Sequence, residues 1–239
     1  MWYHVSYLPI SLFSLRQSLS TSSGAKTLLV PTPFAIKTAL LDAAIRVMGK
    51  GQATLLFPMI RDAQIAVRLP EQLVVINSFL KIVRPKKNGP SDDLGSGLVT
   101  PFGSTIAYRE FVSYSGVIDL ALSSNEGDTL PSEIVLLFAQ INYFGKRGSF
   151  FQLTEPPRLT DKLDEGWTLL TTEQQQFIAD GTIQMLDDYG PAVTFERADI
   201  TSGVRITAGK DRVQRPIVLP CRLVRSSRAF SLYQRIIPS

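Results

Sequence analysis

The sequence contains a single cysteine and a single histidine among 239 residues, Cys221 and His4. One cysteine rules out a disulfide within the chain, which fits a reducing cytoplasm. A structural zinc site needs several thiol or imidazole ligands, so we expect neither a metal nor another cofactor. A serine or cysteine nucleophile activated by an imidazole would have to use His4.

Long apolar runs are also missing. The longest, residues 134–139, is far too short to cross a bilayer, and the N-terminus lacks the basic region and cleavage site of a signal peptide. We therefore expect a soluble cytoplasmic protein without membrane contacts. Charged residues make up only 19% of the chain, below the usual quarter, while the 44% hydrophobic fraction is typical of a folded protein. The low charge favours a surface that is partly covered by partner molecules.

The net charge of +4 hides an uneven distribution. Residues 1–60 carry five basic and one acidic side chain, and residues 200–239 carry eight basic and one acidic. Between them, residues 155–199 carry ten acidic and three basic side chains. Two basic ends around an acidic segment indicate a face that binds a polyanion, with solvated charge on several faces as the alternative.

Hydrophobic periodicity predicts an alternation of strands and helices. The expected elements are a strand at 2–13, a helix from 34 to Gly49, strands at 63–69, 72–83 and 106–122, a helix at 130–143, and a strand at 149–153. Residues 84–105 hold three prolines and four glycines and cannot build a core, so we expect them to form a long protruding arm. The order βαββαβ predicts an α+β, ferredoxin-like domain of the RNA-recognition-motif type over residues 1–153.

The remaining residues, 154–239, are expected to form an acidic connection followed by a small β-rich C-terminal part. The connection holds one short helix-like stretch at 172–178. The predicted strands that follow lie at 192–197, 203–207, 215–224 and 229–237.

Three segments in order carry a family resemblance. They are TLLVPTPFAIKTALLDAAI (27–45), IAYREFVSYSGVIDLAL (106–122) and INYFGKRGSFFQL (141–153). In this order they resemble the CRISPR-associated Cas-five family of the RAMP superfamily, over about the first two thirds of the chain. The resemblance implies a non-catalytic subunit of a type I Cascade complex that binds and caps the 5′ handle of crRNA. It also implies contacts with the backbone subunit and the large subunit.

On this resemblance we expect seven RNA-binding residues: Arg16, Lys26, Lys37, Tyr108, Arg109, Lys146 and Arg147. Lys37 lies one turn into a helix whose first N–H groups suit a phosphate, and Tyr108 has a ring on which a base can stack. The glycines around Lys146 and Arg147 let the backbone approach the RNA closely. Solvated surface, or an ion pair such as Arg109 with Glu110, is the alternative for each.

The arm of residues 84–105 is expected to contact the guide. Its basic residues, Lys86 and Lys87, suit phosphates, and its apolar residues, Leu98, Val99 and Phe102, suit insertion between bases or docking on a neighbouring subunit. The basic C-terminal segment has three alternative partners: RNA, target DNA near the foot of the complex, or the large subunit.

Two other functions stay open. A processing endoribonuclease of the same superfamily needs a general acid and base at the cleaved phosphodiester. One branch of the family, in type I-C systems, cuts precursor crRNA with a tyrosine, a lysine and a histidine. Here His4 is the one histidine, and residues 201–210 hold two glycines where processing enzymes have a glycine-rich loop. The third alternative is a protein-interaction module that binds no RNA.

Overall fold

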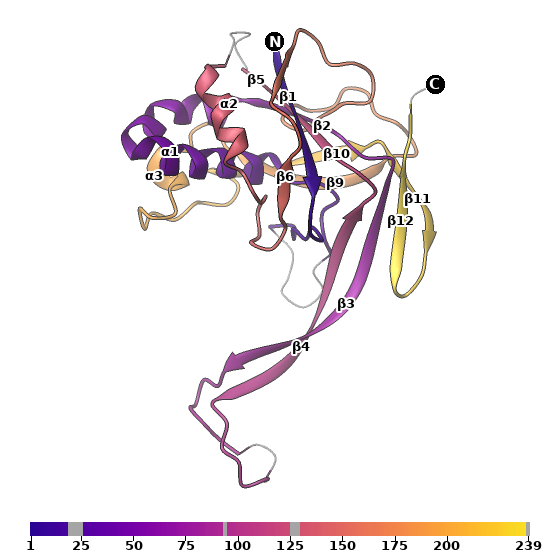
Figure 1. Ribbon diagram of the computed structural model, residues 1–239. Helices are drawn as coiled ribbons and strands as arrows, with labels where there is room; N and C mark the ends of the chain where they lie inside the picture. The colour runs from indigo at the N-terminus through magenta and orange to yellow at the C-terminus, as the bar shows by residue number, and fades with distance from the viewer. Residues whose placement is uncertain (19–25, 93–94, 125–129, 238–239) are drawn as a thin grey trace.

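The computed structural model describes residues 1–18, 26–92, 95–124 and 130–237 (Figure 1). Within these residues the fold is mixed and rich in sheet, with three helices and twelve strands that pair antiparallel in three sheets. In the described part of the chain, no helix combines the length and the apolar character that a membrane crossing requires.

The elements follow one another along the chain with connections of very different length, the longest of them between β1 and α1. Their bounds are β1 Trp2–Pro9, α1 Pro33–Asp62, β2 Gln64–Arg68, β3 Gln72–Pro85, β4 Phe102–Tyr114, β5 Ile118–Ser123, α2 Ser132–Ala139 and β6 Phe151–Leu153. Then come β7 Arg158–Thr160, β8 Thr168–Leu169, β9 Thr182–Tyr189, α3 Phe195–Ala198, β10 Arg212–Leu219, β11 Cys221–Ser226 and β12 Phe230–Arg235.

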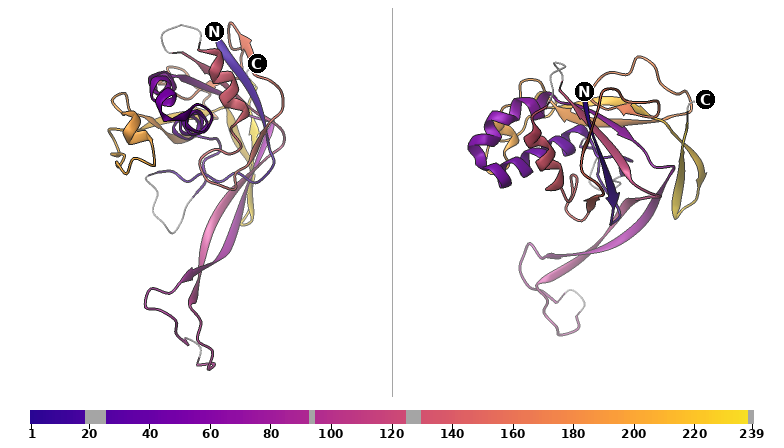
Figure 2. Two further views of the ribbon diagram at one scale, coloured as in Figure 1. Left: turned by 60° about the vertical axis from the view of Figure 1, so that its left-hand side comes forward. Right: turned by 45° about the horizontal axis from the view of Figure 1, so that its top comes forward.

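The largest sheet has the strand order β6-β1-β5-β2-β8, and β7 also pairs with β1. Both α1 and α2 lie on the same side of this sheet (Figure 2). Strand alternation sends Tyr7 toward the helices, where its hydroxyl donates to the Phe138 carbonyl of α2 at 2.8 Å. The opposite face carries polar groups, and Trp167 packs over them against His4.

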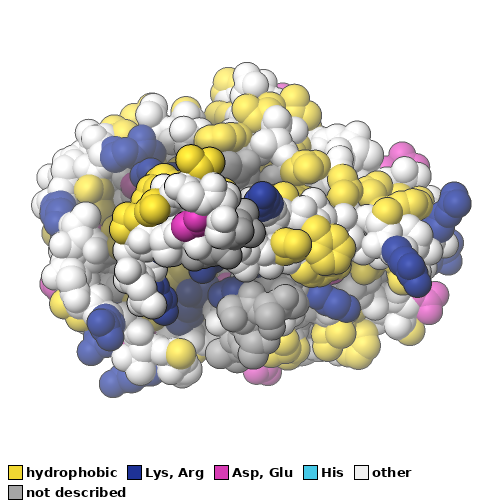
Figure 3. Space-filling view, turned by 90° about the horizontal axis from the view of Figure 1, so that it is seen from below, with side chains coloured by type: hydrophobic (Ala, Val, Ile, Leu, Met, Phe, Trp, Pro, Cys, Tyr) yellow, Lys and Arg dark blue, Asp and Glu magenta, His cyan; other side chains and the backbone are white. Residues whose placement is uncertain are grey.

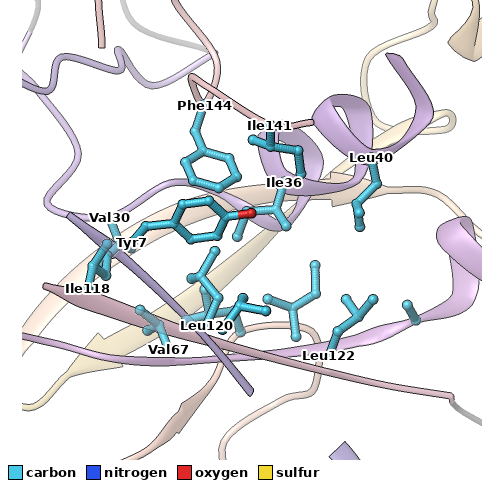
Figure 4. Packing of buried hydrophobic residues seen from close by; sticks show 14 of the residues in the cluster. Tyr7, Val30, Ile36, Leu40, Val67, Ile118, Leu120, Leu122, Ile141 and Phe144 are labelled. Carbon is cyan, nitrogen blue, oxygen red and sulfur yellow. The ribbon is translucent and has the colours of Figure 1, made fainter. Parts of the chain in front are cut away.

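The core fills the layer between this sheet and the two helices. Figure 4 shows Tyr7 from β1, Leu120 and Leu122 from β5, and Ile36 and Leu40 from α1 directed into one cluster. All five side chains are 2% exposed or less, and burial of an aliphatic or aromatic side chain stabilises a fold by roughly 1.5–3 kcal/mol. The core therefore fixes the position of α1 relative to the sheet.

The first helix is longer than the sequence predicts. Gly49 interrupts it with φ 79° and ψ 164°, as the expected end at this residue requires, but the chain re-enters a helix and continues to Asp62. The second half buries Ala53, Phe57 and Ile60, which recur at helical spacing. Gly49 is therefore a kink between two helical segments rather than a terminus.

The expected strand over 106–122 is two strands in different sheets. Strand β4 ends at Tyr114, and β5 begins at Ile118 in the large sheet. Strands β3 and β4 pair from Leu73↔Tyr114 to Pro85↔Phe102, so the hairpin extends well beyond the body of the molecule (Figure 1). At its base this hairpin belongs to a four-stranded sheet of order β11-β12-β3-β4.

The C-terminal third differs most from expectation. Residues 172–178 form no helix, residues 195–198 form α3 in place of the expected strand, and residues 203–207 form no strand. Strand β8 joins the large sheet, and β12 pairs with β3. The predicted parts, 1–153 and 154–239, therefore share two sheets instead of packing as separate units.

The two-stranded sheet of β9 and β10 attaches the acidic segment to the first helix. Lys37 of α1 and Asp188 of β9 form an ion pair of 2.7 Å, with side-chain exposures of 2% and 3%. The Lys37 ammonium also donates to the Arg61 carbonyl at 2.7 Å. Burial lowers the pKa of Lys37, against the opposing effect of the Asp188 charge.

Candidate nucleic-acid interface

A groove of about 680 Å³ runs along one face of α1. Its lining is largely apolar and includes Phe34, Leu41 and Ile45, whose spacings of seven and four residues place them on one side of the helix. Residues 14–16, 141–143, 145–146 and 198–201 also line the groove. The groove thus lies between segments that are far apart in the sequence.

Four predicted RNA-binding residues, Arg16, Lys26, Arg109 and Lys146, line this groove together. In the described part of the chain none of the four forms an ion pair. Lys and Arg side chains gather on this underside of the molecule (Figure 3). Unpaired cations around an apolar floor suit a ligand that has phosphates and flat apolar rings.

Two local features bring these basic residues to one site. Arg16 and Thr27 form an isolated β-bridge, and the Thr27 N–H donates to the buried Glu110 carboxylate at 2.8 Å. This hydrogen bond ties the segment that carries Arg16 and Lys26 to β4, beside Arg109. Glu110 therefore positions the site instead of neutralising it.

The turn that carries Lys146 depends on glycine. Gly145 has a φ of 72°, and a Cβ at this position would lie 2.8 Å from Cδ1 of Leu15. Only glycine adopts this conformation readily at such close approach. The turn can therefore pack closely against Leu15, next to Arg16, while the approach of its glycines to RNA stays a prediction.

The groove is also lined by two arginines that the sequence did not indicate, Arg46 and Arg212. Arg46 pairs with Asp42 through Nε at 2.8 Å, one helical turn earlier. Arg212 pairs with Asp187, and its guanidinium lies 4.2 Å from the centre of the Phe34 ring. Their charges are already partly used inside the protein, so they contribute mainly to the shape of the site.

The structure places Lys37 away from any ligand. Its ammonium is buried and ion-paired with Asp188, because the face of α1 that carries Lys37 packs against β9 instead of facing solvent. The start of the helix is also less open than expected. Pro33 has no N–H, and the Ala35 N–H donates to the Thr32 hydroxyl at 3.2 Å, so two of the first three helical positions are unavailable to a phosphate.

Tyr108 and Arg147 lie outside the lining of the groove. The Tyr108 hydroxyl donates to Glu110 at 3.1 Å, and its ring packs edge-on against Phe79 at 5.5 Å. Arg147 is exposed on the turn next to Lys146. These positions stay predictions as RNA contacts.

The residues expected to act on the guide lie at the far end of the β3–β4 hairpin. Lys87 is exposed, whereas the Lys86 ammonium donates to Ser91, to its carbonyl at 2.7 Å and to its hydroxyl at 2.9 Å. The apolar residues of the set are all strongly exposed: Leu98 by 72%, Val99 by 64% and Phe102 by 55%.

His4 lies with Ser6 and Asp119 on the opposite face of the large sheet, away from the groove. Its Nε2 atom is 3.2 Å from Asp119 Oδ1, and the same oxygen accepts a hydrogen bond of 2.5 Å from the Ser6 hydroxyl. A nucleophilic triad needs the serine and the carboxylate on different ring nitrogens, but here both face Nε2. Although burial opposes ionisation, hydrogen bonds from Ser6, Arg68 and His4 give Asp119 a lowered pKa. The cluster is thus an ionised, internally satisfied polar network.

Comparison with known proteins finds a relative among CRISPR-associated proteins. No protein-family model matches it. Over 155 residues it is 28% identical to the CRISPR-associated protein Cas5 of Archaeoglobus fulgidus, a match that covers 62% of this chain and 63% of that protein. The chain thus matches less than two thirds of the length of this relative.

Solved structures of CRISPR proteins also align along nearly the whole chain. A crystal structure of a CRISPR protein from Archaeoglobus fulgidus aligns with 98% of this chain and 91% of its own, at 13% identity and a TM-score of 0.46. A chain of a CRISPR RNA-guided surveillance complex aligns with 99% and 91%, at 14% identity and a TM-score of 0.48. The likeness to Cas5 rests on the sequence match. The chain is thus similar to the CRISPR-associated protein Cas5, a match consistent with a member of the Cas5 family.

Proposed function

We propose that this protein is a non-catalytic, RNA-binding subunit of a cytoplasmic type I CRISPR effector complex, Cascade. Its groove along α1 binds and caps the 5′ handle of crRNA. The convergence of Arg16, Lys26, Arg109 and Lys146 on one groove, unpaired in the described part of the chain, carries this proposal. These residues come from three separate segments, and nothing in packing alone requires that their charges meet.

The strand order supports a ferredoxin-like unit beneath this groove. Strand β1 leads to α1 and β2, and β5 leads to α2 and β6, with β1 and β5 in the middle of the sheet. This is the arrangement expected from two βαβ-like halves, into which the β3–β4 hairpin is inserted. We propose that the hairpin is the arm, that its exposed apolar tip meets the guide, and that the backbone and large subunits cover neighbouring surfaces.

The handle proposal is tested by reversing charges in the groove. Arg16→Glu and Lys146→Glu together should weaken binding of a labelled 5′-handle RNA by roughly tenfold or more. Each phosphate contact removed should also lower the slope of log K against log salt by about 0.7. Fluorescence anisotropy over a salt series measures both quantities.

Lys162→Glu is the matched control. Lys162 is an exposed lysine outside the groove and, like Lys146, has no ion-pair partner in the described part of the chain. It should leave the handle affinity close to that of the unchanged protein. Equal handle affinity in the groove variant and the control would refute the assignment of the handle to this groove.

The absence of catalysis is tested separately. Repeat RNA incubated with the purified protein should stay intact, because His4 faces Asp119 and Trp167 on the sheet side opposite α1. Gel analysis of end-labelled RNA measures cleavage. Cutting that disappears in His4→Ala would make the protein a processing endoribonuclease instead.

A further inference from the structure

The outer face of the four-stranded sheet β11-β12-β3-β4 carries a continuous row of apolar and aromatic side chains. The register pairs Phe230 with Ile76 and Ile76 with Phe111, so these three residues lie side by side across β12, β3 and β4. The neighbouring row contains Leu232 and Val74. Because side chains alternate along a strand, both rows point to the same face.

This face lies outside the hydrophobic core. The alternate residues of the same strands, Leu73, Val75 and Val112, are 6% exposed or less and belong to the core. In contrast, the outward residues are partly exposed, and none of them belongs to the core cluster or packs against it: Val74, Ile76, Phe111, Phe230 and Leu232. The sheet therefore has one buried face and one apolar face that the core does not use.

Arginines surround this apolar face. The register places Arg222 opposite Gln234 and Arg225 opposite Leu232, so both belong to the outer face at the β11 edge. On the other side, Arg109 lies opposite Ser78, two residues from Phe111. None of the residues that these pairings place on the outer face is an aspartate or glutamate. Figure 3 shows a second group of basic side chains on the right, where Figure 1 has β11 and β12.

We propose that this outer sheet face binds a single-stranded nucleic acid, with bases against Phe230 and Phe111 and phosphates at Arg222 and Arg225. Aromatic rings on an open sheet are a common platform for unpaired bases, and flanking arginines attract the backbone. The Arg225 guanidinium already lies 5.8 Å from the centre of the Phe230 ring, in position to cover a stacked base.

The charge pattern favours a nucleic acid over a protein partner. A protein docked here would need acidic groups to match arginines at both ends of the face and apolar groups between them. A single strand supplies both at once, because its phosphates and bases alternate along the chain. Phe230 and Phe111 are two strands apart, about 10 Å, so one short segment can reach both rings.

This surface is distinct from the α1 groove and extends the proposed function. Phe230, Ile76 and Arg225 do not line the groove, and Arg109 is the one residue common to both. The inference also accounts for part of the basic charge of residues 200–239.

Two substitutions in the full-length protein test the proposal. The probe is a labelled single strand of mixed sequence, about 12 nucleotides long, used as RNA and as DNA. Phe230→Leu keeps an apolar side chain but removes the ring, and should weaken binding roughly 5- to 150-fold. Phe230→Tyr keeps an aromatic ring and should bind the probe with about the affinity of the unchanged protein. Arg225→Gln should lower the salt slope by about 0.7.

Phe177→Leu and Lys162→Gln are the matched controls, since both residues are exposed and lie outside this sheet. Both should leave affinity and salt slope unchanged. Thermal denaturation of each variant separates a loss of binding from a loss of folding. Unchanged binding in folded Phe230→Leu and Arg225→Gln would overturn the proposal, as would tighter binding of a duplex than of either single strand. A protein partner on this face would produce the first of these outcomes.

The design also separates this proposal from that of the groove. Adding Phe230→Leu to the groove variant Arg16→Glu/Lys146→Glu should weaken binding of the single strand further, because the two surfaces are distinct. If the groove variant binds the handle normally while Phe230→Leu weakens the single strand, the handle assignment fails and this inference stands. If instead the groove variant loses handle affinity while Phe230→Leu binds the single strand normally, the inference about the sheet surface fails and the handle assignment stands.

Discussion

Replacing Lys37 by alanine should lower the free energy of unfolding by about 3–5 kcal/mol. The substitution removes a buried cation and leaves the Asp188 carboxylate, which is 3% exposed, without its closest partner. The remaining cation near Asp188 is Arg215, whose Nε lies 3.6 Å from the other carboxylate oxygen. The Arg61 carbonyl loses its hydrogen bond as well. The cost therefore comes mainly from an uncompensated buried charge, not from lost apolar contact.

Thermal and urea denaturation measure this effect. For a chain of this size, the loss corresponds to a fall in Tm of roughly 6–20 °C. Lys162→Ala removes an exposed lysine and should change stability by less than about 0.5 kcal/mol. Adding Asp188→Asn to Lys37→Ala should recover part of the loss, because the stranded charge disappears. A Lys37→Ala protein as stable as the control would show that the ion pair contributes little to the fold.

Lys37 also shows what the sequence could not reveal. Its place near the start of an amphipathic helix is compatible with exposure. Because it lies one turn after the first N–H groups of that helix, the sequence predicts that it contacts a phosphate. Its partner Asp188 is 151 residues away in a segment that reads as an acidic, loop-rich connection. The strand β9 that carries this aspartate becomes visible only when it packs on α1. A long-range pairing of two charges leaves no local pattern in either segment.

The groove residues could be predicted for a different reason. Arg16, Lys26, Arg109 and Lys146 each belong to a local feature that the sequence shows, such as a glycine-flanked turn or a polar loop beside a helix start. The order of those features along the chain resembles a known family, and this resemblance implied RNA contacts for all four residues. Arg46 and Arg212 also line the groove, but each pairs with an acidic residue inside the protein and has no signal of its own.

The wrong predictions for residues 106–122 and 172–178 have a common physical origin. Residues 106–122 alternate regularly and predict one strand, yet Ser115, Gly116 and Val117 separate two strands in different sheets. Similarly, residues 172–178 have helical spacing but pack as an irregular segment, where the Gln174 side chain accepts a hydrogen bond from the Val218 N–H at 2.7 Å. Tertiary hydrogen bonds of this kind override local propensity, which is a weak preference.

Replacing Gly190 by alanine should destabilise the fold by about 3 kcal/mol, although only one methyl group is added. A Cβ at this position would lie 1.8 Å from the Lys210 carbonyl oxygen and 2.9 Å from its carbon. Both neighbours are backbone atoms, so no side-chain rotation relieves the overlap. The turn around Asp211 must move away, which breaks the hydrogen bond of 2.9 Å from the Gly190 N–H to the Asp211 carbonyl.

The same substitution at Gly51 provides the control. Gly51 lies in the second half of α1 with an ordinary helical backbone. Beyond its own helix backbone, no atom of the described residues lies within 4 Å of the place that an alanine methyl group would take. Gly51→Ala should therefore stabilise the protein by about 0.5–1 kcal/mol, so the two variants should shift the urea midpoint in opposite directions. Equal shifts would show that the contact at Gly190 relaxes without cost.

Gly190→Ala also has an expected consequence for the groove. The turn that it displaces leads directly into Arg212, which lies over Phe34 on the groove floor. At a temperature where the variant is fully folded, its affinity for the handle RNA should fall, while binding of a mixed single strand to the outer sheet face should persist. A loss at the groove alone would show that backbone packing at a residue distant in the sequence sets the position of Arg212. Unchanged handle affinity would mean that Arg16, Lys26, Arg109 and Lys146 bind the RNA independently of the position of Arg212.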